Sequence, residues 1–206
     1  MLTTRAWSWT AGPGYKVTVT NPTDAELVAS CLAGRRESFD VLVERHQRHV
    51  YQLCYRFVGN HEDASDLAQD VFIRAYRGLR GFKGQASLGT WLYRIGVNVC
   101  LNKVGTKTPK PEALDPLLAA SDERIQSHAE SASDALLRGE RAAQVREAIA
   151  RLPKKQRTTL VLRVYHELPH EEIAAILGSS VGAVKANFFH ALNNLKKLMQ
   201  EAGTDR

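Results

Sequence analysis

Apolar residues recur at three- and four-residue intervals through most of the chain after residue 23, which is the spacing of one face of an α-helix. One such run covers residues 36–58 and ends at Gly59, and a second covers residues 63–79. The second run carries two neighbouring apolar stripes, which implies burial on two sides or contact with a partner. The spacing resumes after a polar loop, at residues 91–101. The N-terminal half is therefore predicted to be a helical bundle.

The start of regular structure is marked at Thr23, a plausible helix N-cap with Glu26 three residues later, the spacing of a capping box. Residues 1–22 contain glycines, prolines and one short alternating stretch, and they predict an irregular arm.

The second half is set apart by composition. Residues 105–134 hold three prolines and four serines, which favours an extended linker. Helical spacing returns over residues 135–200, before a tail at residues 201–206. No internal repeat is present, and no strand pattern occurs outside the arm. We predict an all-α protein with two small helical domains, residues 23–104 and 135–200, joined by a flexible linker.

The charge is unevenly placed. The formal net charge is +6, with 13 Lys/Arg against 9 Asp/Glu in residues 1–103, 3 against 6 in residues 104–137, and 12 against 7 in residues 138–206. Two basic blocks thus flank an acidic connector. Basic blocks favour a polyanionic partner such as nucleic acid.

Several functional classes lose support. The three cysteines lie far apart with no CxxC pair, so neither a zinc site nor a disulfide framework is indicated. His46 and His49 share a helix face but lack a third metal ligand. No segment is long and apolar enough for a signal peptide or a membrane span, so a cytoplasmic protein without membrane insertion is expected. We predict no metal and no cofactor.

Residues 168–195 carry the helix-start, helix-end and cap residues that are typical of a helix-turn-helix. Pro169 suits a helix start, Gly178 suits a left-handed helix end, and Ser180 suits the cap of a second helix. The buried stripe of that second helix leaves an outward face that can enter the major groove, where Asn187 can read adenine. The alternative, with no DNA-binding role, is a three-helix bundle with a solvated basic face. The outward residues are Lys185, Asn187, Phe189 and His190, and the candidates for backbone contacts just upstream are Lys154, Lys155 and Arg157.

The string DASDLAQDVF at residues 63–72 closely resembles the region 2.2 motif of the sigma-70 superfamily, in its extracytoplasmic-function (ECF) subfamily. The resemblance covers residues 24–104 and 135–199. It implies that this helix docks on core RNA polymerase. The implied contacts are Asp63, Asp66, Leu67, Gln69, Asp70 and Phe72. The alternative is that these acidic residues only stabilise a helix N-terminus. It explains the charges but not the whole string.

Residues 82–102, centred on TWLYRI, resemble the segments of that family that melt the promoter and read its -10 element. The loop of residues 83–89 would hold a flipped single-stranded base, with Phe82, Asn98 and Asn102 beside it. Trp91 at helical spacing is more often a core residue than a base platform. The implied -10 residues are Phe82, Lys83, Trp91, Arg94, Asn98 and Asn102.

Residues 152–157 and 171–174 resemble regions 4.1 and 4.2, which bind the -35 element in the family. Asn187 and His190 stand where relatives often have arginine, so the family's -35 preference does not transfer. The helix that ends at Val104 also lacks the usual basic cluster. The implied -35 residues are Lys154, Lys155, Arg157, Ser180, Lys185, Asn187, Phe189 and His190.

The resemblance thus implies a non-enzymatic sigma factor of the ECF type. It would bind core RNA polymerase and promoter DNA, melt the -10 element without a cofactor, act on the nucleoid, and be held inactive by an anti-sigma factor. Two other functional classes fit these residues less well. A conventional helix-turn-helix regulator with an N-terminal interaction domain needs neither the region 2.2 string nor the Trp91 segment. A hydrolase that uses Asp66 and Asp70 lacks converging partners.

Overall fold

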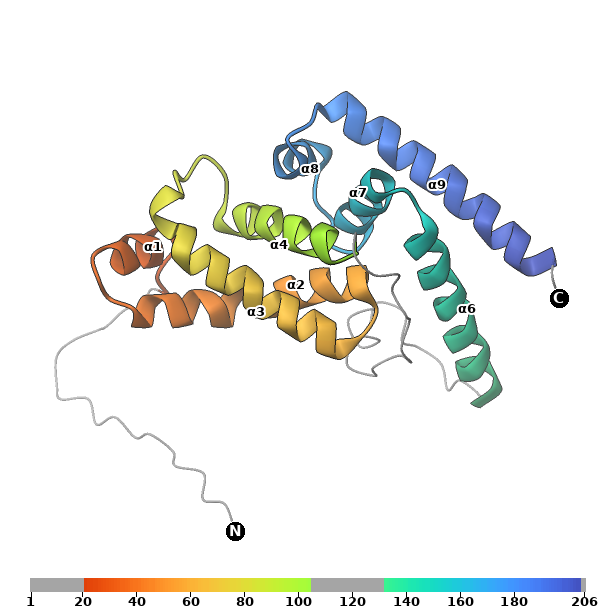
Figure 1. Cartoon of the computed structure of the whole chain (residues 1–206), viewed down its shortest axis with the longest axis horizontal. Helices are drawn as coiled ribbons and strands as arrows, with labels where there is room; N and C mark the ends of the chain where they lie inside the picture. Colours follow the sequence, from red (N-terminus) through yellow and green to blue (C-terminus); the bar gives the residue numbers. More distant parts are fainter. Residues whose placement is uncertain (1–20, 105–131, 205–206) are drawn as a thin grey trace, which may run out of the picture.

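The structure is a computed structural model that describes residues 21–104 and 132–204 (Figure 1). Nearly all of the predicted arm and most of the predicted linker lie outside these ranges. All regular structure in the two described ranges is helical, which confirms the all-α prediction. None of the described helices is long and apolar enough to cross a membrane.

The first group of helices covers residues 24–104. Helices α2, α3 and α4 pack on one another, and α1 packs on α2 (Figure 1). Their bounds are α1 (Asp24–Leu32), α2 (Glu37–Val58), α3 (His61–Gly78), the 3-10 turn η1 (Leu79–Gly81) and α4 (Leu88–Val104).

Local signals set the helix ends in this group. Thr23 and Glu26 form the predicted capping box at the start of α1. Gly59 ends α2 with a φ of 77°, a left-handed conformation that favours glycine, as predicted. Asn60 then caps α3, since its side-chain oxygen accepts a hydrogen bond from the Asp63 backbone N–H at 2.8 Å. Only Gly59 and Asn60 separate α2 from α3.

The core of this group lies where α2, α3 and α4 meet. Leu53, Phe57 and Val71 are fully buried there. A Cβ atom at Gly96 of α4 would lie 2.8 Å from Leu53 Cδ2, so a larger residue there would force the buried Leu53 side chain to shift. The close approach fixes the position of α4 on the bundle.

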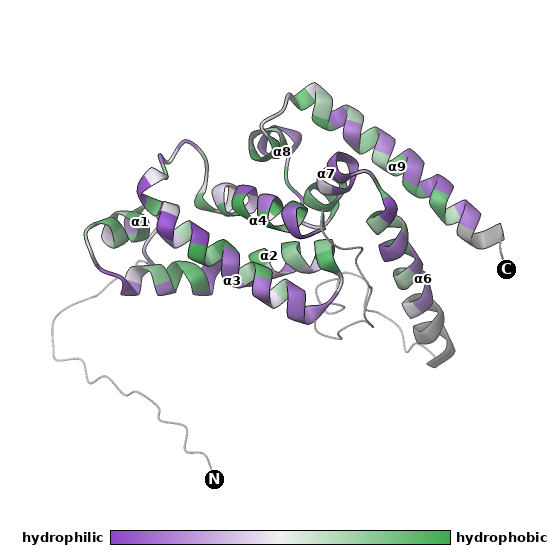
Figure 2. Ribbon diagram, in the orientation of Figure 1, coloured by the Kyte–Doolittle hydropathy of each residue, from purple (hydrophilic) through white to green (hydrophobic). Residues whose placement is uncertain are grey.

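The second group begins three residues before the predicted boundary and extends to Thr204. Helix α9 packs on each of the three helices before it, and along α3 and α9 hydrophilic and hydrophobic residues alternate (Figure 2). The bounds are α6 (Ala132–Arg151), α7 (Lys154–Val164), α8 (His170–Leu177) and α9 (Val181–Thr204).

The two groups are in contact. Helix α8 packs on α4 and α7 packs on α2 (Figure 1), and the buried apolar residues of both groups form one continuous cluster. The sequence permitted either separated or closed domains, and the structure has them closed.

Candidate nucleic-acid interface

The helix-turn-helix unit consists of α8 and α9. Gly178 ends α8 with a φ of 59°, and the Ser180 hydroxyl accepts a hydrogen bond from the Ala183 backbone N–H at 3.2 Å. Both features were predicted from the sequence. Pro169 stands one position before α8 and not at its first residue.

The buried stripe of α9 determines which side chains face outward. Val184 and Ala191 are fully buried, whereas Leu192 is 44% exposed, so Ala191 is the residue that packs inward. Phe189 is 62% exposed, an unusual environment for a phenylalanine. On this face Lys185, Phe189 and His190 are exposed and Asn187 is half-buried.

Asn187 is held in a local hydrogen bond. Its side-chain amide donates to the Ala183 carbonyl at 2.9 Å. Such bonding back to the helix is weak and competes with other partners. The amide is therefore available to a base edge after one side-chain rotation.

The three basic residues before the helix-turn-helix are not equivalent. Lys154 and Lys155 are exposed in the first turn of α7, but Arg157 is only 5% exposed. Its guanidinium donates to the Phe57 carbonyl and, at 3.4 Å, to the Arg56 carbonyl. Burial lowers the pKa of Arg157, because it removes water from the charged guanidinium. In this arrangement Arg157 is inaccessible to DNA.

The predicted -10 segment begins at the turn before α4. The Ser87 hydroxyl accepts from the Thr90 backbone N–H at 3.0 Å and so caps α4. The ring of Phe82 lies 5.2 Å from that of Trp91, and Trp91 is half-buried against the core. The core interpretation of Trp91 fits this packing. Lys83 is exposed in the loop.

Three further residues of this segment share one face of α4. Arg94, Asn98 and Asn102 are exposed at four-residue spacing. At a rise of about 1.5 Å per residue, Asn98 and Asn102 lie about 13 and 20 Å along the helix from Gly89. They do not border the loop of residues 83–89, contrary to the expectation that all would lie beside it. They form a separate line suited to duplex DNA.

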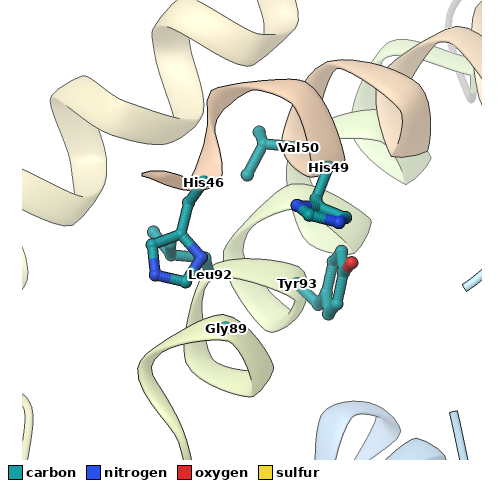
Figure 3. Close-up of a pocket in the computed structure, with 6 residues that line it drawn as sticks. All are labelled: His46, His49, Val50, Gly89, Leu92 and Tyr93. Atoms are coloured by element: carbon teal, nitrogen blue, oxygen red, sulfur yellow. The ribbon is translucent and has the colours of Figure 1, made fainter. Parts of the chain in front are cut away.

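A pocket of about 200 Å³ lies between α2 and α4 (Figure 3). His49 and Tyr93 lie next to each other on one side of it. His46, on the other side, bonds the Asp24 carboxylate at 2.8 Å. Within residues 21–104 and 132–204 no group of three His, Cys, Asp or Glu residues is placed to hold a metal ion.

Helix α3 carries the predicted polymerase-binding string. Some of the predicted residues of this string pack inward, and the others face outward. Asp63 pairs with Lys103 of α4 at 2.8 Å, and Leu67 is buried in the core. Phe72 is half-buried against the core. These three residues hold α3 in the bundle.

The other members of the string form an exposed face. Asp66 and Gln69 are exposed, and Asp70 pairs with Arg74 at 2.9 Å. Ile73 and Tyr76 extend the face and are 43% and 46% exposed. Neither was predicted as a site residue. Tyr76 belongs to the second apolar stripe of this helix, but the rest of that stripe packs inward, and one edge of the Tyr76 ring lies against Phe39 with the ring centroids 5.0 Å apart. Ile73 lies outside that stripe, so the sequence pattern did not indicate it.

Comparisons with known protein families match both helical groups of the chain. The model of sigma-70 region 2 matches residues 42–108, and that of sigma-70 region 4 matches residues 142–195. The RNA polymerase sigma-H factor of Pseudomonas aeruginosa is 35% identical over 186 residues, 88% of this chain and 96% of that protein.

The chain belongs to the sigma-70 family, in its ECF group. The ECF RNA polymerase sigma factor SigW of Bacillus subtilis is 33% identical over 173 residues, 82% of this chain and 92% of that protein. The solved structure of CnrH in complex with the cytosolic domain of CnrY has 26% identity and a TM-score of 0.61, and covers 85% of this chain and 96% of that one. The family predicted from residues 63–72 is thereby confirmed.

Proposed function

We propose that this ECF sigma factor binds core RNA polymerase through α3, reads promoter DNA through α4 and α9, and starts transcription without catalysis of its own. One observation carries the proposal: a single chain presents both an uncovered polar and apolar face on α3 and an outward-facing recognition helix. A regulator that needed only DNA binding would have no use for the first.

The polymerase-binding face comprises Asp66, Gln69, Asp70, Ile73 and Tyr76, which recur at three- and four-residue steps. Apolar anchors surrounded by polar side chains are the usual composition of a protein interface. Asp63, Leu67 and Phe72 support this face from within the bundle.

The -10 element would be read by two parts of the first domain. The exposed loop of residues 83–89, with Phe82 at its base, would capture an unstacked base, because stacking and edge hydrogen bonds are available to single strands. Arg94, Asn98 and Asn102 would contact the adjoining duplex along α4. Melting would then be driven by binding energy alone.

The -35 element would be read by α9 in the major groove. Lys185, Asn187, Phe189 and His190 form the contact face, with Ser180 at the helix start. Lys154 and Lys155 would position the domain on phosphates, which carry no sequence information. Arg157 can join them only after it leaves its buried position.

Regulation by an anti-sigma factor is part of the proposal. It is supported by the family resemblance and by the CnrH structure, which was solved with a bound partner domain. We also place the protein in the cytoplasm, on the nucleoid when it is bound to polymerase.

The experiment that tests the function is run-off transcription with purified core polymerase on a template from the protein's own operon. We expect a discrete transcript that requires the protein and falls at least about tenfold with Asp66→Ala/Asp70→Ala. Gln47→Ala, an exposed change on α2, is the matched control and should leave the transcript unchanged.

The alternative is a conventional helix-turn-helix regulator. It predicts tight binding to duplex DNA without polymerase and no transcript. Absence of a transcript together with failure to comigrate with core polymerase would therefore replace the proposed function with this one.

A further inference from the structure

A small cavity lies where the C-terminal end of α2 meets α6 and α7. Its volume is about 60 Å³, and its lining includes Tyr55 and Arg56 of α2, Arg146 of α6 and Arg157 of α7. We infer that this cavity is a binding site for a tetrahedral oxyanion of the phosphate class. Such a site takes no part in the polymerase and DNA contacts proposed above.

Three buried polar atoms in the lining have no hydrogen-bond partner among the described residues. They are the Tyr55 hydroxyl and the Nε atoms of Arg146 and Arg157. Tyr55 is 3% exposed and Arg157 is 5% exposed, so neither side chain reaches bulk solvent. Buried polar groups in folded proteins are nearly always hydrogen-bonded. Because all three atoms can donate, a ligand that accepts several hydrogen bonds would satisfy them together.

The cavity also gathers positive charge. Three arginines line it, Arg56, Arg146 and Arg157, and arginine keeps its proton in proteins. Burial lowers the pKa of Arg157, so its charged form lacks the stabilisation that water would give. Glu147 also lines the cavity, but its side chain is exposed and its negative charge is screened by solvent. An anion within the cavity would offset the repulsion among the arginines.

Contacts outside the cavity hold two of these donors in place. Nη2 of Arg157 donates to the Phe57 carbonyl, which fixes the guanidinium while its Nε stays unpartnered. The Tyr55 ring packs against that of His61 with the ring centroids 4.8 Å apart. Donors that are already fixed lose little side-chain freedom when a ligand binds. The site is therefore preorganised for its ligand.

Size and donor type together select the ligand. A cavity needs about 10–15 Å³ of such volume to hold one water, so this cavity admits a few waters or one small polyatomic ion. Water would satisfy the donors but would leave the positive charges unbalanced. A carboxylate offers two oxygens, whereas a tetrahedral oxyanion offers acceptors in several directions. Arginine binds phosphate through paired N–H donors, which favours the tetrahedral ion.

Calorimetry of the full chain with inorganic phosphate, at constant ionic strength in chloride, tests the site. We expect saturable binding of a single phosphate per chain. Arg146→Gln should raise the dissociation constant at least about tenfold, since a charge-assisted hydrogen bond is lost. Arg151→Gln removes the same charge from an exposed position on α6 and should change it less than about twofold. Absence of saturable binding, or an equal change in both variants, would overturn the inference.

A second variant tests the site without a change of charge. Tyr55→Phe removes one hydroxyl and should raise the dissociation constant at least about threefold, with unchanged helical circular dichroism. Lys154→Ala/Lys155→Ala tests whether phosphate binds the exposed lysines of α7 instead, and it should leave phosphate binding in place. Loss of binding in that variant, with full binding in Tyr55→Phe and Arg146→Gln, would overturn the cavity site.

Competition distinguishes free phosphate from the phosphate group of a nucleotide. We expect sulfate to displace phosphate, and adenosine monophosphate to do so at least about tenfold less well, because the cavity is far smaller than the pockets that take larger ligands. Equal displacement by adenosine monophosphate would assign the site to a nucleotide's phosphate group. Displacement by neither would contradict a site built from hydrogen-bond donors. These measurements need neither polymerase nor promoter, so their outcome is independent of the proposed function.

Discussion

At the scale of single residues, the two kinds of DNA contact should separate experimentally. Asn187→Ala removes a side chain that can bond one base bidentately, and we expect it to cost about 1–3 kcal/mol on the preferred -35 duplex. The same substitution should cost much less binding free energy on a duplex that is changed at the contacted base pair. Fluorescence anisotropy with paired duplexes measures both.

Lys154→Ala is the matched comparison for Asn187. As a phosphate contact it should weaken binding to all duplexes alike and lower the slope of log affinity against log salt by about 0.9. An equal loss with Asn187→Ala on both duplexes would show that Asn187 does not read sequence.

The outward residues of α9 were predictable because helical spacing alone decides which side chains a buried stripe of Val184 and Ala191 leaves exposed. The position of Arg157 was not. Its partners are the carbonyls at the end of α2, about 100 residues away in the sequence. A backbone carbonyl has no sequence signal, so nothing distinguished Arg157 from the exposed Lys154 and Lys155 beside it.

At the scale of elements, two glycines of the helix-turn-helix should respond in opposite directions to the same change. Gly178→Ala places a Cβ in a left-handed conformation and should lower the free energy of unfolding by about 1 kcal/mol. Gly182→Ala lies within α9 with open space around the new Cβ, and should raise it by up to about 1 kcal/mol. Urea denaturation measures both.

Gly182 is also placed to act in binding, since a glycine in the first turn of α9 lets the backbone approach a ligand closely. If DNA occupies that space, Gly182→Ala should stabilise the protein and weaken -35 binding together. Stabilisation with unchanged DNA binding would mean that the glycine is merely tolerated. Destabilisation would contradict the open surroundings seen in the structure.

Most helix boundaries followed from the sequence because caps are local. Thr23, Gly59, Gly178 and Ser180 each act on backbone groups within a few residues. The exposed Ile73 and Tyr76 were harder to assign, because an apolar stripe on a helix can face a core or a partner. Only the packing of α3 on α2 and α4 decides between these.

At the scale of the whole molecule, the closed arrangement lay beyond sequence reasoning. Each domain has its own helical pattern, and a proline- and serine-rich connector permits any separation between them. The polar contacts between the two groups join residues far apart in the sequence, and they leave no periodic signal in it.

The closed form should be sensitive to acid through His166. Burial, followed by the charges of His49 and Arg56, lowers the pKa of His166 to about 4 from 6.5. The contact with Tyr93 requires an unprotonated Nδ1 that accepts from the hydroxyl, and burial raises the pKa of Tyr93 to about 12, so that the hydroxyl keeps its proton. The stabilisation from neutral His166 is full above pH 6.5 and is lost as the pH falls towards 4, by at most about 3 kcal/mol.

Energy transfer between dyes on Glu44→Cys of α2 and Ala175→Cys of α8, in the Cys31→Ser background, should therefore fall as the pH is lowered from about 6.5 to 4. Glu172 also faces this contact, so His166→Asn, which cannot titrate, is the necessary comparison. Its transfer should change less over the same range. A pH response identical to that of the parent protein would show that His166 is not the group responsible.

The central claim is that α3 docks on core RNA polymerase, and a binding titration tests it most directly because it needs no promoter. The protein, labelled at Glu44→Cys in the Cys31→Ser background, is titrated with purified core polymerase, and the dissociation constant is compared with that of Ile73→Asp and of the control Gln47→Ala. We predict tight binding that Ile73→Asp weakens at least about tenfold, equivalent to about 1.4 kcal/mol, while the control binds as the parent does. Absence of binding, or equal binding by all three, would contradict the assignment of this face.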